Sequence, residues 1–169
     1  MQNLYPKTII NRFVCKKESE MSYQSRIPSD SSYLQAYGQA MYNFSYLEWG
    51  VIWTIAKLSS DGFTSIPTEK SGFDIADAFT KVIQTTNPPL ADALRDQLLK
   101  LDATYRDSVS TINTLLHAHP YTTSTGSQQL GGDKMHWSID ELNTAAKNFE
   151  DAAIECNGLF YGDLAKARP

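Results

Sequence analysis

Apolar residues recur in steps of three and four along three long stretches and one short stretch of this 169-residue chain, and this spacing constrains its fold most strongly. Side chains spaced in this way share one face of an α-helix. The spacing predicts helices over residues 31–59, 73–86, 89–118 and 138–166. No stretch shows the alternation of polar and apolar residues that is typical of strands. We therefore expect an all-α fold, a bundle of four to five helices.

Residues that can cap helices stand where these stretches begin. Asp30 lies in a polar cluster before the first helix, and Ser71 and Ser138 each have an acidic residue three positions later. The latter arrangement is typical of a capping box at a helix start. Pro120 disfavours helical geometry in the residue before it, so the third helix is expected to end there. Residues 121–137 are then expected to form one long loop before the last helix.

The first 28 residues differ in charge from the rest of the chain. They contain five lysines and arginines and two glutamates, which gives +3, whereas the whole chain carries −4. The remainder therefore carries −7, and an acidic body argues against broad electrostatic binding to nucleic acid. We expect residues 1–28 to form a basic tail and residues 29–169 to form a single helical-bundle domain.

No apolar run is long enough for a secretory signal or for the roughly 18 residues of a membrane span. The two cysteines, Cys15 and Cys156, do not make a disulfide framework. Cys156 falls on the apolar stripe of the last helix and is expected to be a buried thiol. The sequence thus predicts a cytoplasmic, reduced protein that does not enter a membrane.

The first predicted helix carries aromatic residues outside its main apolar stripe. They are Tyr42, Tyr46, Trp49 and Trp53. A helix that is apolar on more than one face is expected to be buried on more than one side. One hypothesis for function follows from this surplus, namely a structural bundle that binds another protein through residues such as Tyr42, Tyr46 and Trp53.

The apolar stripe of the third helix includes Tyr105, Ile112 and Leu116, which are expected to lie in the core, and a polar row runs beside it. The row consists of Asp102, Arg106, Ser110, Asn113 and His117. Such a row suits a groove, a dimer contact or a ligand site, or else an ordinary solvated helix face. Glu48, a carboxylate within the aromatic run, is expected to pair with Arg106 or with His117, or to reach solvent. Those two partners are about 16 Å apart along the helix, so Glu48 can meet only one of them.

The arrangement Asn113-x-x-x-His117 resembles the Arg-Asn-x-x-x-His motif of the HEPN superfamily of helical bundles. Many members are metal-independent ribonucleases of toxin–antitoxin, abortive-infection and CRISPR systems, and others are non-catalytic binding modules. The resemblance implies that His117 would exchange a proton with a ribose 2′-hydroxyl. Ile112 stands where the family places the arginine that holds phosphate charge. Arg106 lies six residues earlier, about 9 Å along the axis.

Three hypotheses for function therefore stand. The first is a HEPN-like binding module of a prokaryotic or phage defence system, not catalytic alone, which forms a homodimer through faces that include the polar row. The second is a metal-independent endoribonuclease that uses His117 with an arginine from elsewhere, for instance from a second subunit. The third is the structural protein-binding bundle. RNA or a protein is the expected partner.

The candidate site residues are Asn113 and His117 for catalysis, and Glu48, Arg106 and His119 for binding. A metal site is not expected, because the side chains of His117 and His119 would diverge by about 200° on a helix. No further ligand set accompanies them or His136 in the sequence. No cofactor motif is present either, so no cofactor is expected.

Overall fold

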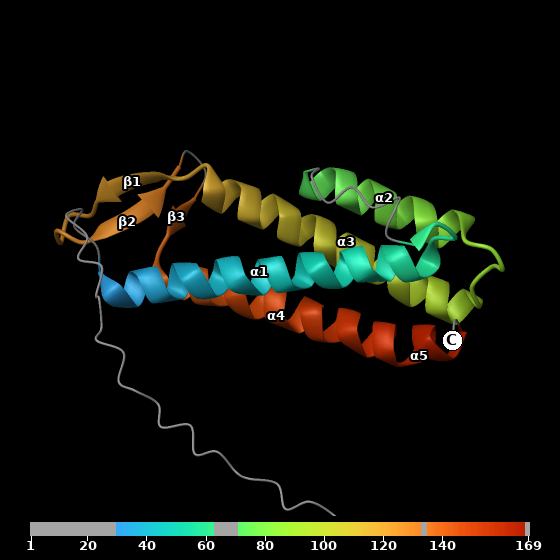
Figure 1. The fold of residues 1–169 in the computed structure, drawn as a ribbon. Helices are drawn as coiled ribbons and strands as arrows, with labels where there is room; N and C mark the ends of the chain where they lie inside the picture. The colour runs from blue at the N-terminus through green and yellow to red at the C-terminus, as the bar shows by residue number, and fades with distance from the viewer. Residues whose placement is uncertain (1–29, 63–70, 133–134, 168–169) are drawn as a thin grey trace, which may run out of the picture.

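The computed structural model describes residues 30–62, 71–132 and 135–167, and over these residues the protein is mostly helical (Figure 1). The helices are α1 Ser31–Leu58, α2 Gly72–Thr85, α3 Asp92–Leu116, α4 Ile139–Tyr161 and α5 Asp163–Ala167. The strands are β1 His119–Thr122, β2 Gln128–Gly131 and β3 His136–Trp137. The four helices that the apolar spacing predicts are confirmed to within a few residues at most of their ends. The expected tail, residues 1–28, lies outside the described residues.

The helix starts are fixed by the predicted caps. The side chain of Asp30 accepts hydrogen bonds from two backbone N–H groups at the start of α1. Ser71 and Ser138 form capping boxes with Asp74 and Glu141, respectively. In the second box, the hydrogen bond from the backbone N–H of Ser138 lowers the pKa of Glu141. The caps satisfy backbone donors that a helix start otherwise leaves unpaired.

Helices α1, α2 and α4 run in one direction, and α3 runs against them (Figure 1). The side chain of Asn43 donates a hydrogen bond to the backbone oxygen of Ala146 at 2.9 Å, and Thr54 Oγ1 lies 3.7 Å from Cys156 Sγ. The two pairs are 103 and 102 residues apart, so α1 and α4 pack as parallel neighbours. Cys156 is buried, which confirms the expectation, and this burial raises the pKa of its thiol to about 11. No helix in the described part of the chain has the length and apolar character to cross a membrane.

The apolar stripe of α3 is buried along most of the helix but not at its end. Ile112 is 2 % exposed, which confirms that it belongs to the core. The prediction that Leu116 shares this burial is wrong, because Leu116 is 52 % exposed. The physical reason is the position of α2. Its first residue, Gly72, lies opposite Val109, so α2 does not extend the further seven residues, about 10 Å, to Leu116.

The segment expected as one long loop contains a small antiparallel sheet with the strand order β1-β2-β3. Gly131 of β2 pairs with His119 on one side and with His136 on the other. The hairpin between β1 and β2 turns at Gly126, whose φ of 88° favours glycine. The all-α expectation is therefore corrected to a mostly helical fold with a small sheet. Strands of two to four residues are too short to show alternation, and the Thr and Gly residues here also mark loops.

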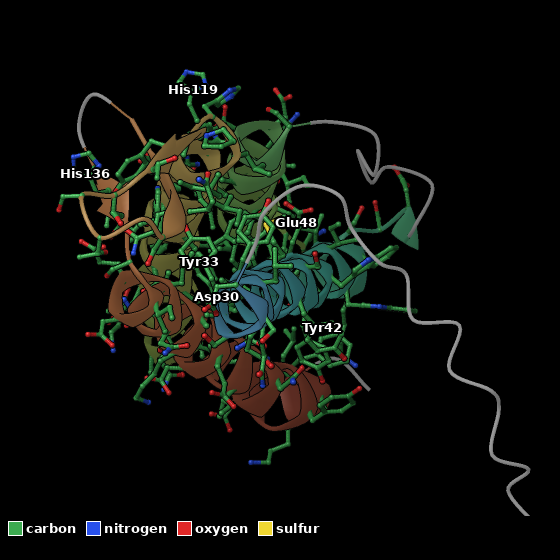
Figure 2. The ribbon with its side chains drawn as sticks, turned by 90° about the vertical axis from the view of Figure 1, so that its left-hand side faces the viewer. Asp30, Tyr33, Tyr42, Glu48, His119 and His136 are labelled. Carbon is green, nitrogen blue, oxygen red and sulfur yellow. The ribbon has the colours of Figure 1, made fainter. Side chains whose placement is uncertain are left out.

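Tyr33 of α1 fixes this sheet to the helices (Figure 2). Its hydroxyl accepts a hydrogen bond from the backbone N–H of Leu130 and donates one to the backbone oxygen of Trp137, both at 2.8 Å. Leu130 and Trp137 are cross-strand partners, so one hydroxyl bridges β2 and β3. The sheet therefore covers the end of the bundle at which α1 and α4 begin.

Candidate functional site

Arg106, a predicted binding residue, joins α3 to α2. Its Nη1 donates to Asp77 Oδ1 at 2.9 Å, and its Nη2 donates to Thr80 Oγ1 at 2.8 Å. Its Nε donates to Oδ2 of the buried Asp102 at 3.2 Å. All three guanidinium nitrogens are therefore engaged within the bundle. Because a buried carboxylate without a partner is costly, this network gives Arg106 a structural role.

Glu48 pairs with neither of the partners predicted for it. Its Oε2 accepts a hydrogen bond from the hydroxyl of Tyr105 at 3.0 Å, whereas Arg106 contacts α2 and His117 is exposed. Both expected pairings, Glu48–Arg106 and Glu48–His117, are therefore wrong. Burial raises the pKa of Glu48, and the hydrogen bond from Tyr105 opposes that shift. The group is a half-buried carboxylate between α1 and α3.

The polar row of α3 does not form one continuous surface. At its start Asp102 is buried and Arg106 faces α2, because α2 covers this part of α3. At its end Asn113 is half-buried and His117 is exposed. His117 caps the helix, and its backbone N–H donates to the backbone oxygen of Asn113 at 3.1 Å. Asn113 and His117 thus share the free end of α3, but the guanidinium of Arg106 is committed elsewhere.

The other two histidines lie on the sheet, one on each side of Gly131 (Figure 2). His119 and His136 are both exposed. His136 Nδ1 lies only 2.7 Å from the place that a Cβ on Gly131 would take, so glycine is required beneath the imidazole. The ring of Tyr121 lies against the same imidazole, with the centroids 5.1 Å apart. Among the described residues, no group of three or more potential ligands could hold a metal ion.

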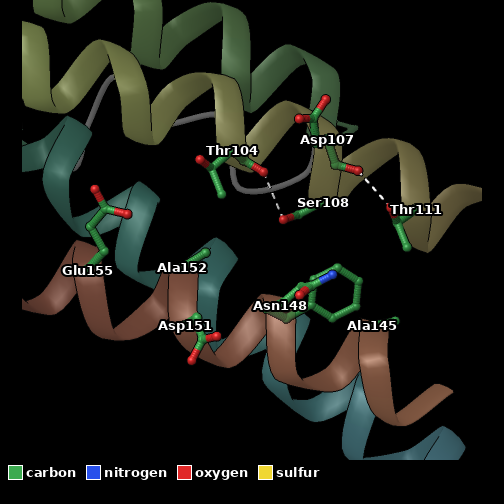
Figure 3. Close-up of a pocket in the computed structure, with 10 residues that line it drawn as sticks. Thr104, Asp107, Ser108, Thr111, Ala145, Asn148, Asp151, Ala152 and Glu155 are labelled. Carbon is green, nitrogen blue, oxygen red and sulfur yellow. Dashed lines mark hydrogen bonds between the residues drawn. The ribbon is translucent and has the colours of Figure 1, made fainter. Parts of the chain in front are cut away.

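A groove with a volume of about 350 Å³ runs between α3 and α4 (Figure 3). Buried apolar residues of α4, including Phe149 and Ala152, form its floor, and Asp107 is one of its acidic lining residues. The hydroxyls of Ser108 and Thr111 donate to backbone oxygens of their own helix, so they are already satisfied. None of the predicted site residues lines this groove.

The most distinctive surface is the outer face of α1, called the aromatic face below. It carries Tyr42, Tyr46, Trp49 and Trp53, which are between 48 % and 66 % exposed. Helix α1 is buried on more than one side, as expected, because it packs against α4, α2 and α3, but these four rings are not part of the buried surface. Steps of four, three and four residues place them in one stripe about 16 Å long. In Figure 2, Tyr42 and Glu48 project from different sides of α1.

Charge is absent from this face. The only charged residues of α1 are Glu48, which bonds to Tyr105, and Lys57, which lies over the ring of Phe160. The exposed residues of the helix are otherwise Ser, Gln, Gly, Leu and aromatic residues. A solvated helix face is normally rich in charge, because only the buried stripe has to be apolar. An exposed face of large rings without charge is typical of an interface.

The aromatic face continues onto α4. The side chain of Asn157 donates a hydrogen bond to the hydroxyl of Tyr46 at 3.2 Å, which joins the two helices at the surface. Ile154 and Tyr161 share a helix face with Asn157 and are 63 % and 76 % exposed. The face thus comprises the four rings of α1 together with Ile154 and Tyr161. With 150–250 Å² for each aromatic side chain, the exposed parts of these residues leave about 600 Å² in contact with solvent. Patches of this size are at the upper end of those on monomeric proteins.

The sequence alone indicates part of this face, through the hypothesis of a protein-binding bundle that uses Tyr42, Tyr46 and Trp53, but the candidate site residues do not include these rings. The rings of Tyr42 and Trp49 repeat with helical spacing on the side of α1 opposite much of its core stripe. A helix side without charge can be either an interface or a second buried face. The two can be told apart only when the neighbouring helices are known. A comparison of the chain with models of protein families, with curated proteins and with solved structures found no match. The case for a site therefore depends on geometry and charge alone.

Proposed function

We propose that this chain is a non-catalytic helical binding module whose aromatic face binds an apolar helix of a protein partner. The carrying observation is the stripe of four large, half-exposed rings on an uncharged helix face. Burying such rings removes apolar area from water, at roughly 25 cal/mol per Å². Tyrosine and tryptophan are also enriched among the few residues that supply most of the binding energy at protein interfaces.

The proposal agrees with one of the two roles that the HEPN resemblance implies, the binding module. Two observations support a role without catalysis. Ile112 is a core residue, and Arg106 donates all of its bonds to α2 and to Asp102. A ribonuclease of the kind the resemblance describes needs a cation beside its histidine to stabilise phosphate charge. Arg106, the arginine nearest to His117 in the sequence, is instead paired with Asp77 and Asp102.

Site-specific photo-crosslinking tests the binding surface directly. A photoreactive phenylalanine analogue replaces Trp49 in the aromatic face, and a matched variant carries it at Thr114, an exposed residue of α3. Irradiation in cells that make the protein should give protein adducts from position 49 and far fewer from position 114. Equal yields at the two positions, or no adduct from position 49, would contradict the proposal.

The ribonuclease hypothesis makes a different prediction, and a separate assay checks it. The purified chain is incubated without metal with structured and unstructured RNA, alongside a mock preparation. A binding module leaves the RNA intact. Cleavage that is lost in His117→Ala and kept in His136→Ala would replace the proposal, because only an enzyme at the end of α3 distinguishes these two exposed histidines.

A further inference from the structure

We infer that the partner of the aromatic face is a second copy of this chain, with the two α1 helices packed antiparallel about a two-fold axis between Ser45 and Tyr46. This inference rests on the proposed function and names the occupant of the same surface. In a two-fold dimer the same patch meets itself, so the patch has to be complementary to itself. Residue sizes along α1 meet that condition.

Antiparallel pairing about this midpoint places Gly38 opposite Trp53 and Ser45 opposite Tyr46. At each of these two levels, a small residue of one copy therefore lies beside a large ring of the other. No atom of the described residues lies within 4 Å of the place that a Cβ on Gly38 would take, so the described part of the chain leaves space there for the indole of Trp53 from the second copy. Small residues opposite large ones allow helices to approach to 8–10 Å and to interdigitate.

A register that pairs Tyr42 with Trp53 lacks this fit, because it also pairs Tyr46 with Trp49 and so sets large rings against large rings along the stripe. In the inferred register Tyr42 of each copy faces Trp49 of the other, which gives two symmetry-related pairs of rings. An offset pair of this kind is worth about 0.5–1.5 kcal/mol beyond its buried area. The register between Ser45 and Tyr46 thus combines two pairs of rings with small residues beside large ones.

Charge and area also favour a second copy. A charged face would repel itself across a two-fold axis, whereas the four rings on the α1 part of the aromatic face are interrupted by no exposed charged side chain. About 600 Å² from each subunit gives about 1,200 Å² in total, the lower limit for specific interfaces. Ile154 and Tyr161 of α4 supply part of this area. An interface of this size fits a dimer that exchanges with monomer.

Disulfide trapping tests the axis, because residues beside a two-fold axis meet their own copies. Ser45→Cys is made in a Cys15→Ser chain, and Ser110→Cys on α3 is the matched control. Both introduced positions are exposed, whereas native Cys156 is buried with a pKa raised to about 11 and stays unreactive near neutral pH. Under mild oxidation at about 100 µM protein, Ser45→Cys should form covalent dimer at least fivefold faster than Ser110→Cys. Equal rates would overturn the inference.

A size swap tests the pairing of Gly38 with Trp53. Gly38→Trp and Trp53→Ala should each lower the dimer fraction in sedimentation equilibrium at least fivefold. The double variant Gly38→Trp with Trp53→Ala should recover at least half of the lost dimer, because the small and large positions exchange places. A double variant as weak as the singles would overturn the register, since loss of folding alone cannot produce recovery.

The two proposals fail in different ways. If position 49 gives protein adducts but the chain is monomeric at all concentrations, the partner is not a second copy, and the proposed binding module is still supported. If position 49 gives no adduct, both the proposed function and the inferred dimer are contradicted. A dimer that persists unchanged in Gly38→Trp would show that self-association uses another face.

Discussion

Replacing Tyr33 with phenylalanine removes one hydroxyl that bridges two strands, and it should destabilise the protein out of proportion to its size. The hydroxyl makes two hydrogen bonds of 2.8 Å, to the N–H of Leu130 and the carbonyl of Trp137. Each bond is worth about 1 kcal/mol net, and a buried backbone group left without its partner adds more. We expect Tyr33→Phe to lower the free energy of unfolding by about 2–4 kcal/mol. At about 3 °C per kcal/mol for a domain of this size, the midpoint should fall by about 6–12 °C.

Urea unfolding followed by far-ultraviolet circular dichroism measures this loss. Hydrogen exchange of the Leu130 amide adds a local readout, because its proton is protected only while Tyr33 accepts it. Tyr42→Phe is the matched control: it removes a hydroxyl from the same helix at an exposed position, and it should cost less than about 0.5 kcal/mol. A loss below about 1 kcal/mol in Tyr33→Phe, or unchanged exchange at Leu130, would refute the reasoning.

Three further predictions concern the core and the buried charges. Ile112→Ala should cost about 2–4 kcal/mol in a urea unfolding curve, whereas Leu116→Ala, half-exposed on the same helix, should cost less than about 1 kcal/mol; similar losses would contradict the end of the stripe. Burial raises the pKa of Glu48, so the folded state binds its proton more tightly, and ionised Glu48 should lower stability as pH rises above the usual pKa of 4.5. Glu48→Gln should therefore be as stable as the native chain at pH 4 and more stable at pH 7. A constant difference in stability from pH 4 to 7 would count against this. Arg106→Leu leaves Asp102 without its cation and should lower the free energy of unfolding by about 2–4 kcal/mol. The double variant with Asp102→Asn should recover part of that stability. No recovery in a double-mutant cycle would show that the two residues do not act as a pair.

Local chemistry made the helices predictable. A serine or aspartate at a helix start and an acidic residue three positions later act within a few residues, so the caps at Asp30, Ser71 and Ser138 follow from the sequence. The burial of Ile112 follows from spacing in the same way. These features need no knowledge of which helix lies beside which.

The sequence named Tyr42, Tyr46 and Trp53 as protein-binding residues, but the exposure of these rings and the partners of Glu48 and Arg106 could not be predicted, because they depend on the order and direction of the helices. The partner of Glu48 is Tyr105 because of the level at which α1 crosses α3, and Arg106 is covered because α2 packs on that side. Rings such as Trp49 are half-exposed because no described neighbour covers that side of α1. The sheet escaped prediction because its strands are too short for alternation to show.

Sedimentation velocity of the full chain over a range of concentrations tests the central claim, that the aromatic face pairs two copies. The native chain should move from its monomer mass of 18.9 kDa toward twice that mass as concentration rises. Trp49→Glu, which places a charge in the centre of the aromatic face, should remain monomeric, and Thr114→Glu, which places the same charge on α3, should behave like the native chain. A native chain that stays at 18.9 kDa, or a Trp49→Glu variant that dimerises as well as the native chain, would contradict the account.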